Sequence, residues 1–328
     1  MTVTAIVAPN AGIYYTAGYW NDIPSVKAEI NERISGRPDV SYLEYFAERV
    51  GRKTFGRALF LNCGNGWVER DFFKHGLIES AVGIDYSEEL LAEARRHGRD
   101  LPVRYMRADI NDAVFDERFD LIVNYAAAHH IAYVDRVFRN LCRHLVTGGY
   151  FVSYDYVGPH RNQYPYEQWE AVWRLNNALP REARQTLRYP HFPTMMHDDP
   201  TEAIHSELTL ETFGRYFRTE EYRAAGGALA YPILTFNRAL ERVDSELRDE
   251  AVETIMTADR RYLADNPGTE LFAFWYGTPR HEVLRDRALL RRWEEDERAR
   301  EDRARAARGR YYEPTLLQAM LYPDAFPV

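Results

Sequence analysis

Short apolar runs alternate along the chain with longer stretches whose apolar residues recur every three or four positions. An apolar run bounded by turn residues predicts a buried strand, and the three-to-four spacing predicts an amphipathic helix. Strands that alternate with helices predict parallel βαβ units, and therefore an α/β protein with a doubly wound sheet. We predict strands over residues 57–62, 81–85, 103–106, 119–123, 150–154, 217–223 and 270–276. We predict helices over residues 24–34, 41–50, 67–75, 87–97, 133–145 and 166–179, and helical structure between 226 and 263.

The order of these elements divides the chain into five segments. They are an aromatic and helical N-terminal lid, the alternating core, an insertion rich in His, Pro, Tyr and Trp that caps the sheet, the end of the core sheet with its helices, and a charged helix with a tail. In that order they span residues 1–50, 51–157, 158–216, 217–280 and 281–328. Pairs at i,i+4 such as Glu294 and Arg298 predict that the charged helix is either solvated or in contact with another subunit. We expect the aromatic tail to dock on another surface.

Composition and charge exclude several classes of function. The chain has 328 residues, 42 Lys and Arg against 50 Asp and Glu, and a formal net charge of −8. This balance disfavours general nucleic-acid binding, because phosphate binding needs positive surface. No apolar stretch approaches the ~20 residues of a membrane helix, and no secretion signal is visible. With two cysteines, Cys63 and Cys142, we expect a protein of the reducing cytoplasm. Aromatic residues make up 14% of the chain. They either serve ordinary packing or line a pocket that takes an apolar or cationic species.

The strongest chemical signal is a glycine-rich turn followed by two acidic residues at strand ends. Cys63-Gly-Asn-Gly66 follows the first predicted strand and opens a helix, so its backbone can approach a ligand closely. Asp85 ends the second strand, where a carboxylate can accept hydrogen bonds from both ribose hydroxyls. Asp109 follows the third strand, and Asn124 follows the fourth. A dinucleotide-binding fold would share the first acidic position, but the turn lacks GxGxxG.

These residues resemble the class I S-adenosylmethionine-dependent methyltransferases over about residues 52–156. The resemblance implies a seven-stranded Rossmann-like sheet with S-adenosylmethionine as cofactor. It implies that Asp85 holds the ribose and that Asp109 reaches the adenine amino group. The family usually has Gly in place of Asn62 and an acidic residue in place of Phe60, but Asn tolerates positive φ well enough to keep the turn. The cofactor-binding residues expected on this basis are Asn62, Gly64, Asn65, Gly66, Asp85, Tyr86, Asp109, Ile110, Asn124 and Tyr125.

The residues expected to meet the methyl acceptor follow the fourth and fifth strands. Of the adjacent His129 and His130, we expect one to pack structurally and the other to line the pocket. A joint metal site is not expected, because adjacent side chains point in different directions. Arg161 is expected either to hold a phosphate or carboxylate or to anchor its loop. The expected substrate-binding residues are His129, His160, Arg161, Gln163, Tyr166 and Trp173.

Two further features suggest chemistry in the insertion. Glu170 lies among aromatic residues on the predicted helix 166–179, where it could take a proton or be an ordinary surface residue. The segment 191–207 holds seven His, Asp and Glu residues whose spacing matches no zinc pattern. Its carboxylates could bind Mg²⁺, or Asp199 could start a helix.

The sequence therefore predicts a methyltransferase that acts on a small, largely apolar natural product. Aromatic walls and Glu170 as base favour C-methylation of an isoprenoid double bond, with Mg²⁺ holding a diphosphate, and this pattern resembles the isoprenoid methyltransferases. The alternative acceptor is a sugar or aromatic metabolite methylated at oxygen or nitrogen. An alternative of another class is a catalytically inactive, cofactor-binding partner protein. We expect a homo-oligomer that binds a small-molecule substrate, and neither nucleic acid nor a membrane.

Overall fold

The computed structural model describes residues 18–51, 53–192, 194–195 and 199–311. The predictions for the first 17 residues, for His197 and Asp198, and for the tail after Tyr311 lie outside these ranges. Within them, no helix has both the length and the apolar character that a bilayer crossing requires. Cys63 and Cys142 are both buried and free.

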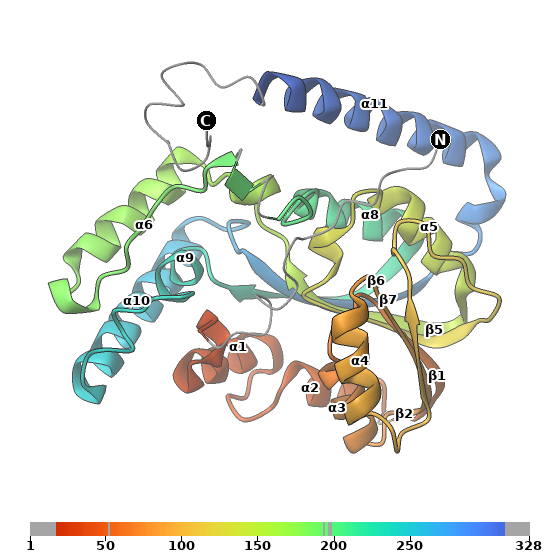
Figure 1. Cartoon of the computed structure of the whole chain (residues 1–328), viewed down its shortest axis with the longest axis horizontal. Helices are drawn as coiled ribbons and strands as arrows, with labels where there is room; N and C mark the ends of the chain where they lie inside the picture. Colours follow the sequence, from red (N-terminus) through yellow and green to blue (C-terminus); the bar gives the residue numbers. More distant parts are fainter. Residues whose placement is uncertain (1–17, 52, 193, 196–198, 312–328) are drawn as a thin grey trace.

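Seven strands of the described chain form one sheet, in the order β3-β2-β1-β4-β5-β7-β6 (Figure 1). The first five strands pair in parallel, whereas β7 runs antiparallel to both β5 and β6. The predicted seven-stranded sheet is confirmed, with the difference that its last two strands make an antiparallel edge. The strands are β1 (Phe55–Phe60), β2 (Ile78–Asp85), β3 (Val103–Arg107), β4 (Phe119–Tyr125), β5 (Leu145–Tyr156), β6 (Phe217–Gly226) and β7 (Phe272–Pro279).

The helices begin and end close to the predicted positions. Ser87 caps α4 as predicted, because its side chain accepts a hydrogen bond from the Leu90 N–H, and acidic residues fill the first turn. The predicted helical stretch between 226 and 263 is divided in two, because Asp244 caps a new helix with a hydrogen bond from the Leu247 N–H. The helices are α1 (Pro24–Ser35), α2 (Tyr42–Arg49), α3 (Trp67–Lys74), α4 (Glu88–His97), α5 (Val134–His144), α6 (Tyr166–Ala178), α8 (Thr209–Tyr216), α9 (Ala230–Leu234), α10 (Ser245–Asp265) and α11 (Arg287–Tyr311).

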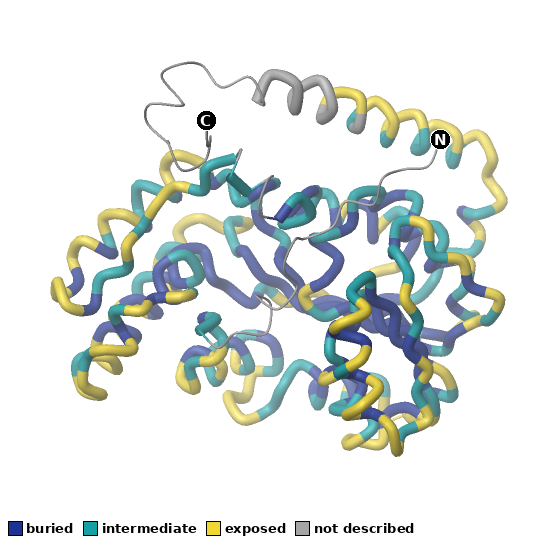
Figure 2. Tube along the Cα trace, viewed as in Figure 1, coloured by how far each residue is buried: buried dark blue, intermediate teal, exposed yellow. Residues whose placement is uncertain are grey.

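The centre of the sheet is buried on both faces. Around the end of β1, Ala58 and Phe60 join a core shared with α1, α2 and α10, whereas Leu59 and Leu61 join a core shared with α5 and α8. Successive residues of a strand point to opposite faces, so a continuous apolar run requires helices on both sides. Figure 2 shows the resulting buried layer between more exposed helices.

The charged helix α11 packs on its own chain. The ring of Trp293 meets that of Tyr216, with 5.3 Å between centroids, and Glu297 Oε1 accepts a hydrogen bond from the Asp135 N–H at the start of α5. Much of the rest of its described surface is exposed (Figure 2). Contact with another subunit stays a prediction.

The sheet places a crevice at the junction of β1 and β4. These strands pair side by side, for example through Leu59 and Ile122, although β2 and β3 come between them in the chain. The loops that follow them therefore leave in opposite directions, and such switch points bind ligands beyond the carboxyl ends of the strands.

Candidate active site

The turn after β1 depends on backbone conformations that few side chains allow. Asn62, Gly64 and Gly66 have φ values of 42°, 54° and 75°, which confirms that Asn62 adopts the left-handed conformation. Gly66 is the N-cap of α3, and a Cβ at this position would collide with the Tyr105 hydroxyl. The turn therefore keeps its tight path only with glycine at 66.

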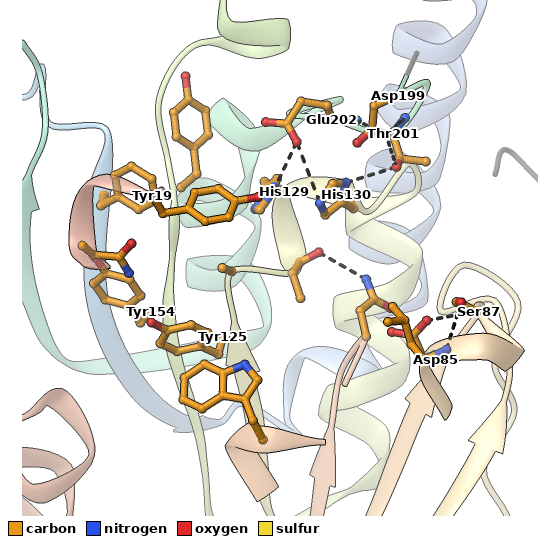
Figure 3. Close-up of a pocket in the computed structure, with 18 of the residues that line it drawn as sticks. Tyr19, Asp85, Ser87, Tyr125, His129, His130, Tyr154, Asp199, Thr201 and Glu202 are labelled. Atoms are coloured by element: carbon orange, nitrogen blue, oxygen red, sulfur yellow. Dashed lines mark hydrogen bonds and ion pairs between the residues drawn. The ribbon is translucent and has the colours of Figure 1, made fainter. Parts of the chain in front are cut away.

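Asp85 ends β2 beside this turn. Its Oδ2 accepts a hydrogen bond from the Gly64 N–H and its Oδ1 accepts one from the Ser87 N–H, both at 2.8 Å. Asp85 is 9% exposed, and burial raises the pKa of its carboxyl. The two backbone donors fix the carboxyl group while it faces the cavity (Figure 3). Each oxygen keeps a second lone pair, so the group can also bind hydroxyls of a ligand.

The loop after β3 supplies a second acidic residue to the same cavity. Asp109 Oδ1 accepts hydrogen bonds from the backbone N–H and the side-chain amide of Asn111, both at 2.9 Å. Ile110 is buried beside it. Of the expected cofactor-binding residues, those that line the cavity are Asn62, Asp85, Tyr86, Asp109, Ile110 and Tyr125.

The remaining expected cofactor-binding residues lie behind the cavity wall. Gly64, Asn65 and Gly66 form the turn but do not contribute to the described lining. The placement expected for Asn124 is wrong: its side chain is buried and donates hydrogen bonds to Ser153 Oγ at 2.6 Å and Asp155 Oδ2 at 2.7 Å. Because β4 continues to Tyr125, Asn124 is still a strand residue, and its side chain points to the face opposite that of Tyr125.

A single cavity of about 1240 Å³ joins the ends of β1 to β4 with the N-terminal helices and the insertion. Tyr19 and Trp20 line it, so the described part of the predicted lid does border the pocket. Sites for one small ligand usually measure about 300–1000 Å³. The cavity is therefore large enough for two molecules.

Aromatic side chains line the part of the cavity away from Asp85. Tyr125 stacks on Tyr154, with 5.3 Å between ring centroids, and Trp67 meets Tyr125 edge-on at 4.9 Å. Tyr42 packs on Tyr125 at 5.3 Å. Burial raises the pKa of Tyr125 to about 12, which keeps its hydroxyl protonated. Further aromatic lining comes from Tyr19, Trp20, Tyr156, Tyr231, Phe236 and Phe272. The aromatic excess of the sequence thus gathers at a pocket.

Two histidines and a glutamate meet at the cavity wall (Figure 3). The Nδ1 atom of His129 lies 2.5 Å from Asp155 Oδ1, and that of His130 lies 3.1 Å from Thr201 Oγ1. Their Nε2 atoms lie 3.8 Å and 3.9 Å from Glu202 Oε2. The expectation that adjacent histidines diverge is wrong, because a short 3₁₀ helix brings their ring centroids within 4.1 Å. Both histidines line the cavity.

Asp155, near the end of β5, organises the histidine pair. Its Oδ2 accepts hydrogen bonds from the N–H groups of Ala127 at 3.2 Å and Ala128 at 2.6 Å. Burial by itself raises the pKa of this carboxyl. The adjoining His129 lowers it by a larger amount, so the net shift is downward. Burial lowers the pKa of His129, whereas Asp155 raises it, and the resulting pKa is about 9. Burial and the neighbouring His129 lower the pKa of His130.

Arg161 anchors the insertion and does not line the cavity. The residue is 1% exposed, and its guanidinium donates to the carbonyl oxygens of Pro200 at 2.6 Å, Glu202 at 3.2 Å and Asp199 at 3.3 Å. The expectation that it holds a ligand phosphate or carboxylate is therefore wrong, and the alternative of loop anchoring holds.

His160 and Gln163 also serve the fold of the insertion. Gln163 donates to the carbonyl oxygens of Arg161 at 2.9 Å and Pro190 at 3.1 Å. His160 Nδ1 lies 2.5 Å from the Ile204 carbonyl oxygen. Neither residue lines the cavity, so their expected contact with substrate is not supported by their positions.

Helix α6 does not direct Glu170, the expected base, into the cavity. Glu170 accepts a hydrogen bond from Arg174 at 2.8 Å and lies outside the cavity lining. Tyr166 and Trp173 are exposed. The buried positions are Gln168, Val172 and Asn176, two of them polar, which is why the apolar pattern indicated another face. The roles expected for Glu170, Tyr166 and Trp173 are corrected accordingly.

Sequence reasoning missed Asp155 as a central residue of the site. An aspartate near the end of the largely buried strand β5 is a signal, because a buried carboxylate needs hydrogen-bond donors. In the sequence, Glu202 is one of several acidic residues of the segment 191–207. Its proximity to His129 depends on contacts between parts of the chain that are 73 residues apart.

Comparison with known proteins finds a family match within the core. Residues 59–153 match the family model described as a methyltransferase domain. Over 152 residues the chain is 26% identical to a ubiquinone biosynthesis O-methyltransferase of Coxiella burnetii, covering 45% of this chain and 63% of the relative. Over 109 residues it is 28% identical to a malonyl-[acyl-carrier protein] O-methyltransferase of Bacillus cereus, covering 33% of this chain and 40% of the relative. The chain thus spans less than two thirds of the length of these curated relatives.

Solved structures resemble the chain at low sequence identity. An S-adenosylmethionine-dependent methyltransferase from Mesorhizobium loti is 20% identical, with 73% of this chain and 99% of that chain covered and a TM-score of 0.45. The [4+2]-cyclase SpnF is 15% identical, with 72% and 79% covered and a TM-score of 0.45.

Proposed function

We propose that this chain, which belongs to the class I S-adenosylmethionine-dependent methyltransferases through its domain at residues 59–153, methylates an oxygen atom of a small aromatic or largely apolar molecule. One observation carries the proposal. A single cavity joins the fixed carboxylate of Asp85 to an aromatic wall around Tyr125. A methyl transfer needs cofactor and acceptor in one enclosed space, because alignment supplies much of the rate.

The strand ends fit the cofactor. Asp85 is fixed by two backbone donors and faces the cavity, so its carboxylate can receive the two ribose hydroxyls. Asp109 and Ile110 would meet the adenine, and the Gly66 turn leaves no room for a Cβ. When bound, S-adenosylmethionine supplies an electrophilic methyl group. The residues of this chain bind it, exclude water and orient the acceptor.

The acceptor half favours oxygen over an isoprenoid carbon. C-methylation of an alkene needs a base to remove a proton, and Glu170 lies outside the cavity beside Arg174. Among the polar groups that face the cavity are His129, His130 and Glu202, which can bind and orient a hydroxyl. Relatives named as O-methyltransferases support this choice. The aromatic wall matches an aromatic or apolar body of the acceptor.

Two measurements test the proposal. Calorimetry should detect binding of S-adenosylmethionine, and Asp85→Asn should weaken it by about 10²–10⁴-fold, because two charge-assisted hydrogen bonds are each worth ~1.5–3 kcal/mol. Glu93→Gln, on α4 outside the cavity lining, is the matched control and should bind normally. Labelled methyl groups should then appear on phenols or alcohols. A wild-type protein that binds no cofactor would refute the proposal, and methylation of prenyl diphosphates alone would refute the choice of oxygen.

A further inference from the structure

We propose that His129, His130 and Glu202 bind one divalent transition-metal ion at the cavity wall. Among the described residues, one ligand atom from each lies within 4.8 Å of the others. Two imidazoles and one carboxylate suit ions such as Zn²⁺, Mn²⁺ or Fe²⁺ better than Mg²⁺ or Ca²⁺, which prefer oxygen ligands. The site therefore differs in chemistry from the Mg²⁺ site considered from the acidic segment alone.

Hydrogen bonds orient both rings toward Glu202. Asp155 accepts the Nδ1–H of His129. The Thr201 hydroxyl donates its single hydrogen to Asp199 Oδ1 at 2.9 Å. Its oxygen therefore accepts the Nδ1–H of His130. In the neutral form, each ring then presents Nε2 as a lone-pair donor to a metal. A carboxylate behind a ligating histidine is the usual way in which proteins fix its orientation and strengthen it as a ligand.

The three ligand atoms are close to the spacing that a metal requires. The two Nε2 atoms lie 3.8 Å and 3.9 Å from Glu202 Oε2. Ligands about 2.0–2.1 Å from a tetrahedral ion are about 3.4 Å apart, so an approach of about 0.5 Å by Glu202 would bring its oxygen to that spacing from both nitrogens. When both imidazoles are neutral, their Nε2 atoms and Glu202 Oε2 are all lone-pair donors to a cation placed between them. Because the pKa of His129 is about 9, metal binding at neutral pH would release the proton that this ring carries.

The backbone on both sides of the cluster is held in place. Ala126 and Ala203 have φ values of 48° and 46°, in the left-handed region that side chains disfavour. The Ile204 N–H donates to the His129 carbonyl at 3.1 Å, and Arg161 binds the carbonyl of Glu202. Strained conformations persist where surrounding contacts over-determine them, and they concentrate at functional sites. This observation is independent of the ligand spacing and indicates a site built in advance.

The role of the metal rests on the proposed function. Three protein ligands leave further coordination positions, and the cluster faces the cavity that holds the acceptor. A metal there would bind acceptor oxygens and lower the pKa of a bound hydroxyl. That hydroxyl would release its proton to water. Its oxygen would then form the C–O bond as the C–S bond of the cofactor breaks, with the electron pair left on sulfur. The acceptor class is thus a molecule with two neighbouring oxygens, which can chelate the ion beside the aromatic wall.

Metal binding is tested without cofactor or acceptor. Protein stripped with a chelator and dialysed should bind one Zn²⁺ or Mn²⁺ per chain by calorimetry, and Co²⁺ should give the absorption of a nitrogen-ligated ion. Glu202→Gln and His130→Gln should each weaken binding by at least about 10–100-fold. The control is His205→Gln, from a second described group of His160, His205 and Glu207, and it should change nothing. No binding tighter than about 0.1 mM, or loss of binding in His205→Gln but not in Glu202→Gln, would overturn the site.

A second assay separates the site from its role. Methyl transfer should fall on removal of the metal and return when Zn²⁺ or Mn²⁺ is restored, while affinity for S-adenosylmethionine stays the same. Metal binding with unchanged turnover after chelation would overturn the acceptor-binding role and support the site. Failure of the proposed function would show as no transfer to any acceptor, and it leaves the metal measurement decisive by itself.

Discussion

A buried carboxyl beneath the glycine-rich turn should make the stability of this protein depend on pH. Glu69 of α3 is 0% exposed, and the hydrogen bonds from its own backbone and from the Cys63 thiol offset only part of the effect of burial on its pKa. A Cβ on Gly83 would meet Glu69 Oε1 at 2.6 Å, which places the carboxyl against β2. Burial raises its pKa to about 8. The protonated form is therefore the one that the fold accommodates.

The sign and size of the effect follow from linkage. In the unfolded chain Glu69 loses its proton near the ordinary glutamate pKa of 4.5, whereas in the folded protein it loses it near 8. Its contribution is fully favourable below the unfolded pKa and is lost as the pH rises toward the folded pKa. The total loss is about 5 kcal/mol, most of it between pH 5 and 8. This is a large share of the 5–15 kcal/mol that typical domains have.

The test compares the pH dependence of unfolding in two isosteric variants. Glu69→Gln removes the ionisation, so its free energy of unfolding, from urea titrations of the ligand-free protein, should fall less steeply from pH 5 to 8 than that of wild type. Glu79→Gln removes a carboxyl from an exposed position of β2 and should keep the wild-type slope. Because the comparison uses the slope of the free energy of unfolding against pH, any pH-independent change in stability caused by the new amide cancels. Parallel profiles for wild type and Glu69→Gln would refute the reasoning.

Two further substitutions address the turn and the insertion. Gly66→Ala should abolish measurable binding of S-adenosylmethionine, because its φ of 75° and the Tyr105 hydroxyl both oppose a Cβ; calorimetry with normal affinity would contradict this. Arg161→Ala leaves three carbonyl groups without their buried donor and should lower the free energy of unfolding by at least about 3 kcal/mol. Because the same carbonyls belong to the segment that carries Glu202, this variant should also bind Zn²⁺ more weakly, and unchanged values of both quantities would show that the anchor is dispensable.

The sheet could be predicted because its signals are local. Each strand of the core is a short apolar run, and each helix beside it carries its own period and cap, as Ser87 does for α4. Asn62 and Asp85 lie at the ends of such runs, so their place beside the cavity follows from the strand order alone. The antiparallel course of β7 has no such signal, because a buried apolar strand has the same sequence pattern in either direction.

Helix α6 shows where local pattern fails. Its buried face holds Gln168 and Asn176, and their amides donate to the carbonyl oxygens of Ala228 and Gln185. Polar residues with such partners can be buried at little cost, but the partners lie in other segments and are invisible to periodicity. The aromatic residues that suggested an active-site face, including Trp173, are exposed instead.

The part of the cavity proposed to bind the acceptor is also assembled by contacts between segments that are distant in the sequence. The proposed cofactor half is built by strand ends, whose positions the sheet fixes. The proposed acceptor half is assembled from Tyr19, His129, Glu202 and Tyr231, which belong to the N-terminal segment, the loop after β4, the insertion and the start of α9. Change in any one of these segments alters the acceptor pocket without disturbing Asp85. A fold arranged in this way can keep one methyl donor and exchange acceptors, so sequence motifs identify the donor site far better than the substrate.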